Sequence, residues 1–431
     1  MTKVAFYLHN GLIANRDCTT ILTGNPGIGG TEYLFYYIAY QLQLLSLSDL
    51  YVILLTSHDC ILPYNFKYLN VGNIVGAIDY CENNNYDILV VNFDKKNFYP
   101  NIFAKSNLKV KFIIWAHNVM SNELLTIIAR TKAIRKIVNV GREQLDLYRD
   151  HVAFKKSTYI YNSVPIKEKE YYISNSIPFS QRKNEVTYMG NISPVKGFHI
   201  LAKAWPQIVK AVPDAHLNVI GSASIYGDAK LGKYGIAEED YEKEFMPYLI
   251  DRKGKVFPSV TFYGKLGEEK NEILSRTKVG VPNPSGISET FCLSAVEMEL
   301  YGCRMVTRRY IGFLDTIPDC AGSLYEDESY IADTVVRELK NTTYDYNLCY
   351  DYIYENFSPN KIISKWISLL KNIENDFHED IIVNKNYNYK NIRELNRKIK
   401  SNIPFGYNLP TLDTYIKICN KFLRTKLPII Y

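Results

Sequence analysis

The stretch Val279–Thr307, VGVPNPSGISETFCLSAVEMELYGCRMVT, predicts a buried strand, a Pro/Ser/Gly loop, a helix and a second strand. A strand that runs through small residues into a helix start presents free backbone N–H groups to an anion. Glu289 and Glu297 lie in this stretch, eight residues apart. Eight residues of helix rise about 12 Å, which is roughly the span from a sugar hydroxyl to a ribose across a diphosphate. The stretch therefore predicts a nucleotide-sugar site.

The spacing of the two glutamates also predicts where each one lies. On one continuous helix they would be about 80° apart around the axis. We therefore expect Glu289 in the loop or first turn and Glu297 inside the helix. The alternative is a solvated helix face, since the chain has 45 acidic residues. The small residues before Glu289, the apolar residues between the glutamates and the strand after Gly302 favour the site.

The rest of the chain alternates short apolar strands with helical stretches. Such strands are typical of a parallel sheet that is covered on both faces. Two such runs predict an α/β chain of two doubly wound, Rossmann-like domains, each binding ligand at the carboxyl ends of its strands. The expected strands are residues 4–10, 51–57, 87–92, 111–118 and 134–141, then 185–191, 215–221, 259–265, 279–284 and 303–308.

Breaks in this pattern predict the domain boundaries. Residues 1–165 form the first Rossmann-like domain, on the acceptor side, and the polar, period-free stretch 166–183 is the expected linker. Residues 184–357 form the nucleotide-sugar domain, with an insertion near 222–258. A C-terminal helix in 358–380 could pack back on the first domain, and 381–431 is a basic tail.

Composition restricts the compartment and the partners. The eight cysteines are scattered without a CxxC or paired spacing, which argues against structural disulfides and a zinc site. Met1-Thr2-Lys3 leads directly into a strand, no apolar run approaches 18 residues, and we expect a cytoplasmic protein. From Lys385 onward, ten Lys/Arg against two acids give +8, so the remainder is nearly neutral.

Three further sites in the sequence, two loops and one histidine, favour binding of a phosphorylated ligand. The loop 24–32, GNPGIGGTE, follows the first strand and precedes a helix, although it is neither a P-loop nor a GxGxxG fingerprint. His117 ends a strand at the edge where ligands bind. GNISPVKG (190–197) opens a helix, and its Lys196 can neutralise a diphosphate. Each also has a plain structural alternative. The loop 24–32 would be an ordinary turn, His117 a histidine whose hydrogen bonds are made within the protein, and Lys196 a solvated surface lysine.

Because these segments follow one another in this order along the chain, it resembles glycosyltransferase family 4. Members of that family are retaining, nucleotide-sugar-dependent enzymes of the GT-B fold. The resembling segments are 27–32, His117, YNSVP (161–165), 190–197, YGKL (263–266) and 285–307, over about residues 4 to 370. The most specific segment is the last, with the family's E-x7-E motif. The resemblance implies two Rossmann-like domains facing a central cleft and a glycosyltransferase activity.

The resemblance also implies roles for single residues. Glu289 would bind hydroxyls of the donor sugar, Glu297 the ribose, and Lys196 the diphosphate. His117 would lie near the reacting face of the sugar, so that Glu289, His117 and Lys196 are the expected catalytic residues. The remaining donor-binding positions implied are Gly29, Gly30, Gly190, Asn191, Leu266, Phe291, Cys292 and Leu293.

One position departs from the family pattern. The family usually has Arg where this chain has Asn191, followed five residues later by Lys196. Asn cannot replace the charge of a bidentate Arg–phosphate pair. The diphosphate would then rest on Lys196, helix N-termini and Arg308 or another base. No Asp/His cluster predicts a metal site, so we expect metal-independent transfer without a cofactor besides the nucleotide-sugar.

The acceptor and the role of the tail stay open from sequence. A surface polysaccharide, a lipid-linked glycan and a protein glycan all fit as acceptors. The basic, aromatic stretch 385–431 fits a peripheral contact with an anionic membrane, whereas no nucleic-acid module accompanies it; a solvated or body-packed extension is the alternative. Rival functions are a nucleotide-sugar epimerase of GT-B type and an inactive nucleotide-sugar-binding protein; a phosphorylase would need a far longer chain.

Overall fold

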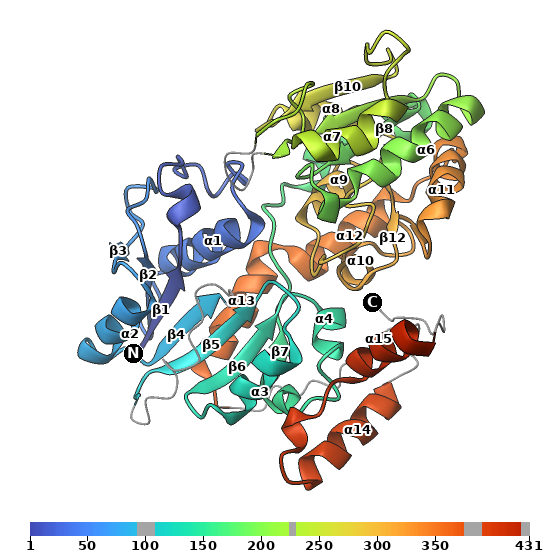
Figure 1. Ribbon diagram of the computed structural model, residues 1–431. Helices are drawn as coiled ribbons and strands as arrows, with labels where there is room; N and C mark the ends of the chain where they lie inside the picture. Colours follow the sequence, from blue (N-terminus) through green and yellow to red (C-terminus); the bar gives the residue numbers. More distant parts are fainter. Residues whose placement is uncertain (93–107, 224–229, 375–389, 424–431) are drawn as a thin grey trace. The chain divides into compact units, whose positions relative to one another are not determined.

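The computed structural model describes residues 1–92, 108–223, 230–374 and 390–423. The chain divides into two compact units (Figure 1). Unit 1 comprises residues 1–21, 34–162 and 360–431, and unit 2 comprises 22–33 and 163–359. Each unit is built around one parallel sheet, as the alternation of strands and helices predicts.

In the part of the chain that the structure describes, the sheet of unit 1 has seven strands in the order β3-β2-β1-β4-β5-β6-β7. All pairings are parallel, with Val4 opposite Val52 on one side and opposite Ile88 on the other. The order reverses direction at β1, which makes the β1–β4 edge the switch point of this sheet. The strands are β1 (Thr2–Leu8), β2 (Leu50–Thr56), β3 (Tyr68–Asn70), β4 (Ile88–Asn92), β5 (Lys111–Ala116), β6 (Ile134–Asn139) and β7 (Ser157–Tyr159).

The central strands of unit 1 are apolar on both faces because helices cover the sheet. Trp115 of β5 and Phe6 of β1 pack against Trp366, with ring centroids 4.8 and 5.7 Å away. Trp366 lies on α13, which returns to unit 1 after unit 2 is complete. The helices are α1 (Gly30–Leu44), which begins in unit 2, α2 (Ile74–Asn83), α3 (Asn122–Arg130), α4 (Arg142–Asp146), α13 (Pro359–Lys371), α14 (Lys390–Asn402) and α15 (Leu412–Leu423).

Among the described residues of unit 2, six parallel strands form a sheet in the order β10-β9-β8-β11-β12-β13. Its core is formed by α6, which buries Phe198, Leu201, Trp205 and Ile208 at helical spacing against the sheet. The strands are β8 (Glu185–Met189), β9 (His216–Ile220), β10 (Val260–Gly264), β11 (Val279–Gly280), β12 (Arg304–Arg308) and β13 (Gly322–Tyr325).

The helices of unit 2 follow the predicted alternation, with one addition. The helix α5 (Lys169–Ser174) lies inside the stretch 166–183, where the sequence shows no period. The others are α6 (Phe198–Ala211), α7 (Glu239–Phe245), α8 (Lys270–Arg276), α9 (Leu293–Leu300), α10 (Ile311–Thr316), α11 (Ile331–Lys340) and α12 (Tyr346–Phe357). The predicted fold class of two Rossmann-like, doubly wound sheets is confirmed.

Candidate functional site

The switch point of the unit 2 sheet brings together two of the loops that were predicted to bind the donor. β8 pairs with β9 on one side and with β11 on the other, so the loops that leave β8 and β11 meet at the carboxyl edge of the sheet. The first loop is 190–197 and the second is 281–292. Because consecutive loops at a switch point turn in opposite directions, they leave room for a ligand between them.

Lys196 and Glu289 form an ion pair across these two loops. Lys196 Nζ lies 2.7 Å from Glu289 Oε2, and the two side chains are 27% and 10% exposed. Asn283 Nδ2 donates a second hydrogen bond to the same oxygen, at 2.9 Å. Glu289 lies in the loop before α9 and Glu297 lies inside that helix, as the spacing argument predicted. The two residues expected to act together, 93 positions apart, are thus in direct contact.

Gly197 lets the two loops approach each other this closely. Its φ of +68° is in the left-handed region, which favours glycine. A Cβ at this position would also lie only 2.6 Å from the backbone nitrogen of Ser285. The Ser285 hydroxyl in turn donates to the Val195 carbonyl and accepts from Ile287 N. The glycine after Lys196 is therefore a packing requirement of the site.

The glycine loop before α1 belongs to unit 2 and lies against α9. A Cβ on Gly30 would meet Leu293 Cδ1 at 3.3 Å, and a Cβ on Gly27 would overlap the side chain of Lys265. The Asn25 side chain holds the loop by accepting from Gly27 N and Ile28 N, both at 2.9 Å. The loop therefore brings its backbone to the N-terminus of α9, where Phe291, Cys292 and Leu293 were predicted to bind the donor.

Cys292 is the N-cap of α9 and makes no side-chain cap hydrogen bond to it. The first N–H groups of any helix lack partners within that helix, so they point toward an incoming anion. Burial raises the pKa of the Cys292 thiol to about 12. The thiol is therefore neutral and unsuited to act as a nucleophile.

Glu297 has a partner that sequence reasoning missed. Lys270 Nζ lies 2.8 Å from Glu297 Oε2, and these side chains are 19% and 25% exposed. Lys270 begins α8, directly beyond Leu266, the residue predicted to lie beside the base. Lys265 and Lys270 both follow the carboxyl end of β10, but a lysine in that position is not by itself a specific signal. The structure thus adds two lysines to the site.

Gly190 and Asn191 occupy the turn directly after β8. A Cβ on Gly221 would overlap the carbonyl oxygen of Gly190, so the turns after β8 and β9 are in backbone contact. Tyr188 OH donates to the Asn191 carbonyl at 2.8 Å. Asn191 Oδ1 is buried and has no hydrogen bond within the described residues. Arg308, the alternative cation, directs Nη1 at the Ser285 carbonyl at 3.5 Å.

Arg182 supports α9 from the side opposite to its N-terminus. This buried side chain donates to the carbonyls of Tyr301 and Gly302 at 2.6 and 3.0 Å. It also donates to the Thr277 carbonyl, directly before β11. A cation at the C-terminal end of a helix complements the helix dipole. Arg182 lies in the stretch expected as linker, where sequence alone showed no role.

His117 belongs to unit 1 and directly follows β5, as predicted. Its ring is packed against Trp115 at 4.6 Å and Phe35 at 5.9 Å between centroids. Burial lowers the pKa of His117 to about 3. The imidazole is therefore neutral at physiological pH and can exchange hydrogen bonds but carries no charge.

The described residues contain no group of three or more His, Cys, Asp or Glu side chains arranged to hold a metal ion. None of their helices has the length and hydropathy that crossing a membrane requires.

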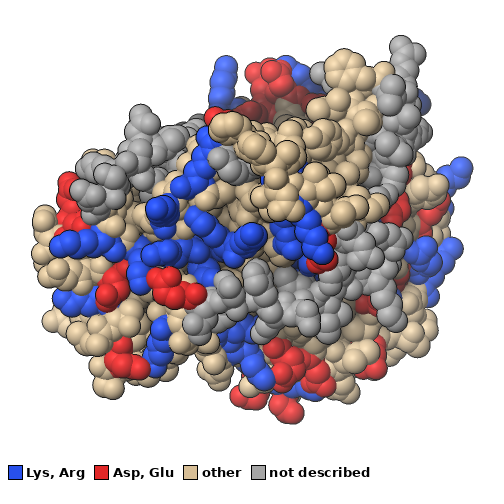
Figure 2. All heavy atoms as spheres, turned by 90° about the horizontal axis from the view of Figure 1, so that it is seen from below, with Lys and Arg blue, Asp and Glu red and all other residues tan. Residues whose placement is uncertain are grey.

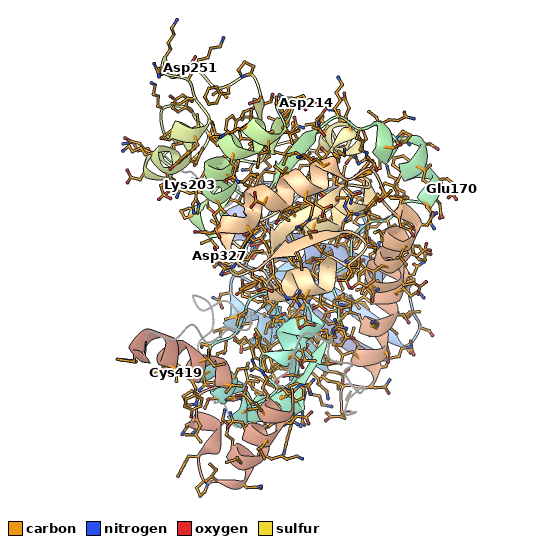
Figure 3. All side chains as sticks on the ribbon, turned by 90° about the vertical axis from the view of Figure 1, so that its right-hand side faces the viewer. Glu170, Lys203, Asp214, Asp251, Asp327 and Cys419 are labelled. Carbon is orange, nitrogen blue, oxygen red and sulfur yellow. The ribbon has the colours of Figure 1, made fainter. Side chains whose placement is uncertain are left out.

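An open cavity of about 550 Å³ lies at the other end of the unit 2 sheet. Its lining includes His216, where β9 starts, and Ser259, the residue before β10. Asp214, labelled in Figure 3, borders it. Because this is the amino edge of the sheet, the cavity is separate from the site described above.

Comparison with known proteins supports the fold. Residues 183–341, which lie inside unit 2, match the family model described as glycosyl transferases group 1. No curated protein matches the chain.

Solved structures match over most of the chain. HepE from Anabaena, solved with UDP and glucose, has a TM-score of 0.58 at 15% identity, covering 86% of this chain and all of its own. Sucrose-phosphate synthase from Thermosynechococcus elongatus has a TM-score of 0.60 at 14% identity, with coverages of 86% and 99%. AviGT4, a glycosyltransferase of avilamycin A biosynthesis, has 0.56 at 14% identity, with coverages of 87% and 98%. Residues 183–341 are thus similar to the group 1 glycosyl transferases, and the chain has the GT-B fold.

Proposed function

We propose that the protein is a retaining glycosyltransferase that moves a sugar from a nucleotide-diphosphate-sugar to a glycan, lipid-linked or protein acceptor. The observation that carries this proposal is the Lys196–Glu289 ion pair at the switch point of unit 2, beside the N-terminus of α9. A cation and helix amides suit a diphosphate, and a carboxylate suits sugar hydroxyls. One compact site thus offers groups for both halves of the donor.

The donor would replace the two ion pairs of the site, Lys196–Glu289 and Lys270–Glu297. Lys196 would turn from Glu289 to the diphosphate, which frees Glu289 to accept hydrogen bonds from the sugar. Lys270 holds Glu297 in the same way, so a ribose would compete with that lysine for the carboxylate. The helix amides near Phe291, Cys292 and Leu293 would take the phosphate oxygens, together with the backbone at Gly29 and Gly30.

Lys265 is our candidate for the cation that Asn191 does not supply. Its side chain lies against Gly27, at the start of the loop that contacts the N-terminus of α9. A flexible ammonium can neutralise phosphate as a point charge, although it does not form the bidentate pair of an arginine. The diphosphate would then lie between Lys196 and Lys265.

The chemistry needs stabilisation of the leaving group more than it needs a protein base. As the glycosidic bond breaks, negative charge grows on the β-phosphate. Lys196, Lys265 and the helix dipole of α9 would be aimed at this charge, an effect usually worth several kcal/mol. A leaving phosphate oxygen can take the proton of an acceptor that attacks on the same face, which retains the configuration. Glu289 then positions the sugar, and neutral His117 would orient the reacting face or the acceptor hydroxyl.

The donor, the metal requirement and the location follow as narrower proposals. Since HepE was solved with UDP and glucose, a UDP-sugar is the first donor to test. We propose metal-independent transfer, because lysines and helix amides already supply the positive charge at the diphosphate. A cytoplasmic location and a role in surface polysaccharide or glycoconjugate synthesis stay predictions. Acceptor binding is assigned to unit 1.

Turnover of UDP-sugars with and without added acceptor tests the proposal. We expect release of UDP that rises with acceptor, survives EDTA, and falls strongly in Glu289→Ala. Glu297→Gln should raise the donor KM. Glu272→Gln, on the exposed side of α8, is the matched control and should leave both parameters unchanged.

Three outcomes would contradict parts of this proposal. Full activity in both Glu289→Ala and Glu297→Gln would remove the site assignment. Activity lost in EDTA and restored by Mn²⁺ would overturn metal independence. Nucleotide release that ignores acceptors would favour the epimerase, and donor binding without any release would favour the inactive binding protein.

A further inference from the structure

The C-terminal helix α14 has an inverted distribution of polar and apolar residues. Its charged Arg393 and Lys400 are 2% and 1% exposed, whereas its apolar Ile392, Leu395 and Ile399 are 51%, 59% and 52% exposed. A surface helix of a globular protein normally turns its apolar stripe toward the core. The spacing i, i+3, i+7 places these three residues on one stripe, so α14 presents an apolar face to the outside.

A buried carboxylate explains why the polar face of α14 is turned inward. Asp150 is 0% exposed and lies between Arg393 Nη1 at 3.5 Å and Lys400 Nζ at 3.6 Å. It also accepts hydrogen bonds from Asn396 Nδ2 at 2.9 Å and from Leu412 N at 2.5 Å. These contacts hold α14 and the start of α15 on unit 1 without using the apolar stripe.

Further exposed apolar residues follow α14 along the chain. Phe405, between the helices, is 69% exposed, and on α15 Tyr415, Ile418 and Phe422 are 40%, 46% and 75% exposed. These three again repeat at i, i+3, i+7. The two helices lie next to each other in Figure 1, and Cys419, labelled in Figure 3, marks α15. We call Ile392, Leu395, Ile399, Ile403, Phe405, Tyr415, Ile418 and Phe422 the C-terminal apolar surface.

Positive charge surrounds this surface. Residues 390–423 contain seven Lys/Arg and two acids. Arg393 and Lys400 are buried against Asp150, whereas Lys398 is exposed. Exposed Lys155 lies on the 3-10 helix 152–156, which contacts α14, and exposed Arg130 donates to Asn408 Oδ1 at 2.9 Å. Figure 2 shows one face of the molecule, on which Lys and Arg side chains lie among acidic and uncharged ones.

We propose that the C-terminal apolar surface docks on an anionic lipid bilayer. Apolar and aromatic side chains on one face with basic residues beside them are the features of helices that lie in the membrane interface. The net charge complements acidic headgroups, each nearby cation adding to the attraction. A protein partner would not require the cationic border, whereas a bilayer with anionic lipid satisfies both the stripe and the charge.

Flotation of the full chain with vesicles tests this proposal. Vesicles of equal parts phosphatidylcholine and phosphatidylglycerol are compared with vesicles of phosphatidylcholine alone. The test variant is Leu395→Asn/Ile399→Asn. The control is Leu348→Asn/Ile173→Asn, which changes the same residue types at 56% and 53% exposure on α12 and α5. Both variants are first matched to the parent by thermal unfolding.

We expect the parent and the control to float with anionic vesicles. The test variant should partition about thirtyfold more weakly, or ~2 kcal/mol at 1.4 kcal/mol per tenfold, since two half-exposed aliphatic side chains lose their burial. Lys155→Gln/Lys398→Gln should weaken flotation with anionic vesicles.

The same experiment contains the results that would overturn the proposal. Equal flotation of the test and control variants would mean that the stripe does not insert. Equal binding to both vesicle types would remove the charge argument. Absence of flotation together with a dimer that Leu395→Asn/Ile399→Asn dissociates, measured by analytical ultracentrifugation, would assign the surface to a second copy of this chain. None of these readouts depends on the proposed transferase activity.

Discussion

Opposite changes in nucleotide affinity are expected from the two halves of the Lys196–Glu289 pair. Lys196→Gln removes a cation that the diphosphate of UDP would use, whereas Glu289→Gln removes a carboxylate that competes for this cation and repels phosphate. The pair is only partly exposed, at 27% and 10%. Lys196→Gln should therefore weaken binding of UDP, and Glu289→Gln should strengthen it.

The structure sets the size of both effects. A hydrogen bond to a charged group contributes about 1.5–3 kcal/mol, so Lys196→Gln should weaken UDP binding roughly 10- to 100-fold. An exposed ion pair is worth about 0–1 kcal/mol, and the pair that UDP must break is less exposed, so Glu289→Gln should strengthen UDP binding about fivefold or more. Turnover should nevertheless fall in Glu289→Gln, because the sugar loses its positioning group.

Calorimetric titration with UDP, which lacks the sugar, measures both variants directly. Glu272→Gln serves again as the control for loss of one negative charge. If Glu289→Gln weakened UDP binding as much as Lys196→Gln does, the competition between carboxylate and phosphate would be refuted. Such an equal loss would indicate that the pair only maintains the shape of the loops.

Further predictions concern stability, tail docking and pH. Gly197→Ala should cost about 1–3 kcal/mol and lower the Tm, because alanine is strained at φ +68° and meets Ser285; an unchanged Tm would show that the loops can separate freely. Asp150→Ala should release α14 and α15, since breaking a buried pair costs about 3–5 kcal/mol; hydrogen exchange in 390–423 should rise, and unchanged protection would mean that other contacts hold these helices. The pKa of His117 is lowered to about 3 in the folded chain. Below pH ~6.5, the ordinary pKa of histidine, the unfolded chain therefore takes up a proton at His117 that the folded chain does not. The His117 contribution to stability is complete above pH ~6.5 and falls by about 1.4 kcal/mol per pH unit below it. In denaturant titrations at several pH values, the free energy of unfolding of His117→Gln should lack this part of the pH dependence. The same pH dependence in the variant and the parent would place the acid sensitivity elsewhere.

Much of the fold was predictable because strand patterns are local. Continuous apolar runs such as Ile88–Asn92 predicted buried parallel strands, and the observed bounds differ from the expected ones by one to four residues at most ends. The short edge strands β3, β7 and β13 were not predicted. Each has only three or four residues, and β3 is exposed throughout, so none shows an apolar run.

The sequence predicted which residues belong to the candidate site better than it predicted which of them are in contact. Glycine loops, Lys196 and the paired glutamates stood out in sequence because each follows a strand at the carboxyl edge. Lys270, 27 residues before Glu297, did not stand out, since one lysine among many carries no local signal. Its position depends on how β10 and α8 are arranged beside α9.

The sequence by itself determined that this chain alternates strands and helices in two runs and that phosphate-binding loops follow particular strands. Burial periodicity and turn chemistry act between near neighbours, so they can be inferred without knowing the fold. Only the tertiary structure decided which distant side chains meet. The partners of Asp150 lie more than 240 residues away in the sequence. The Sγ atoms of Cys320 and Cys349 lie 3.0 Å apart, although the sequence spacing of these cysteines gave no indication of a contact. Strand order and helix docking fix such contacts, and the inward turn of the charged face of α14 follows from the buried carboxylate that it meets.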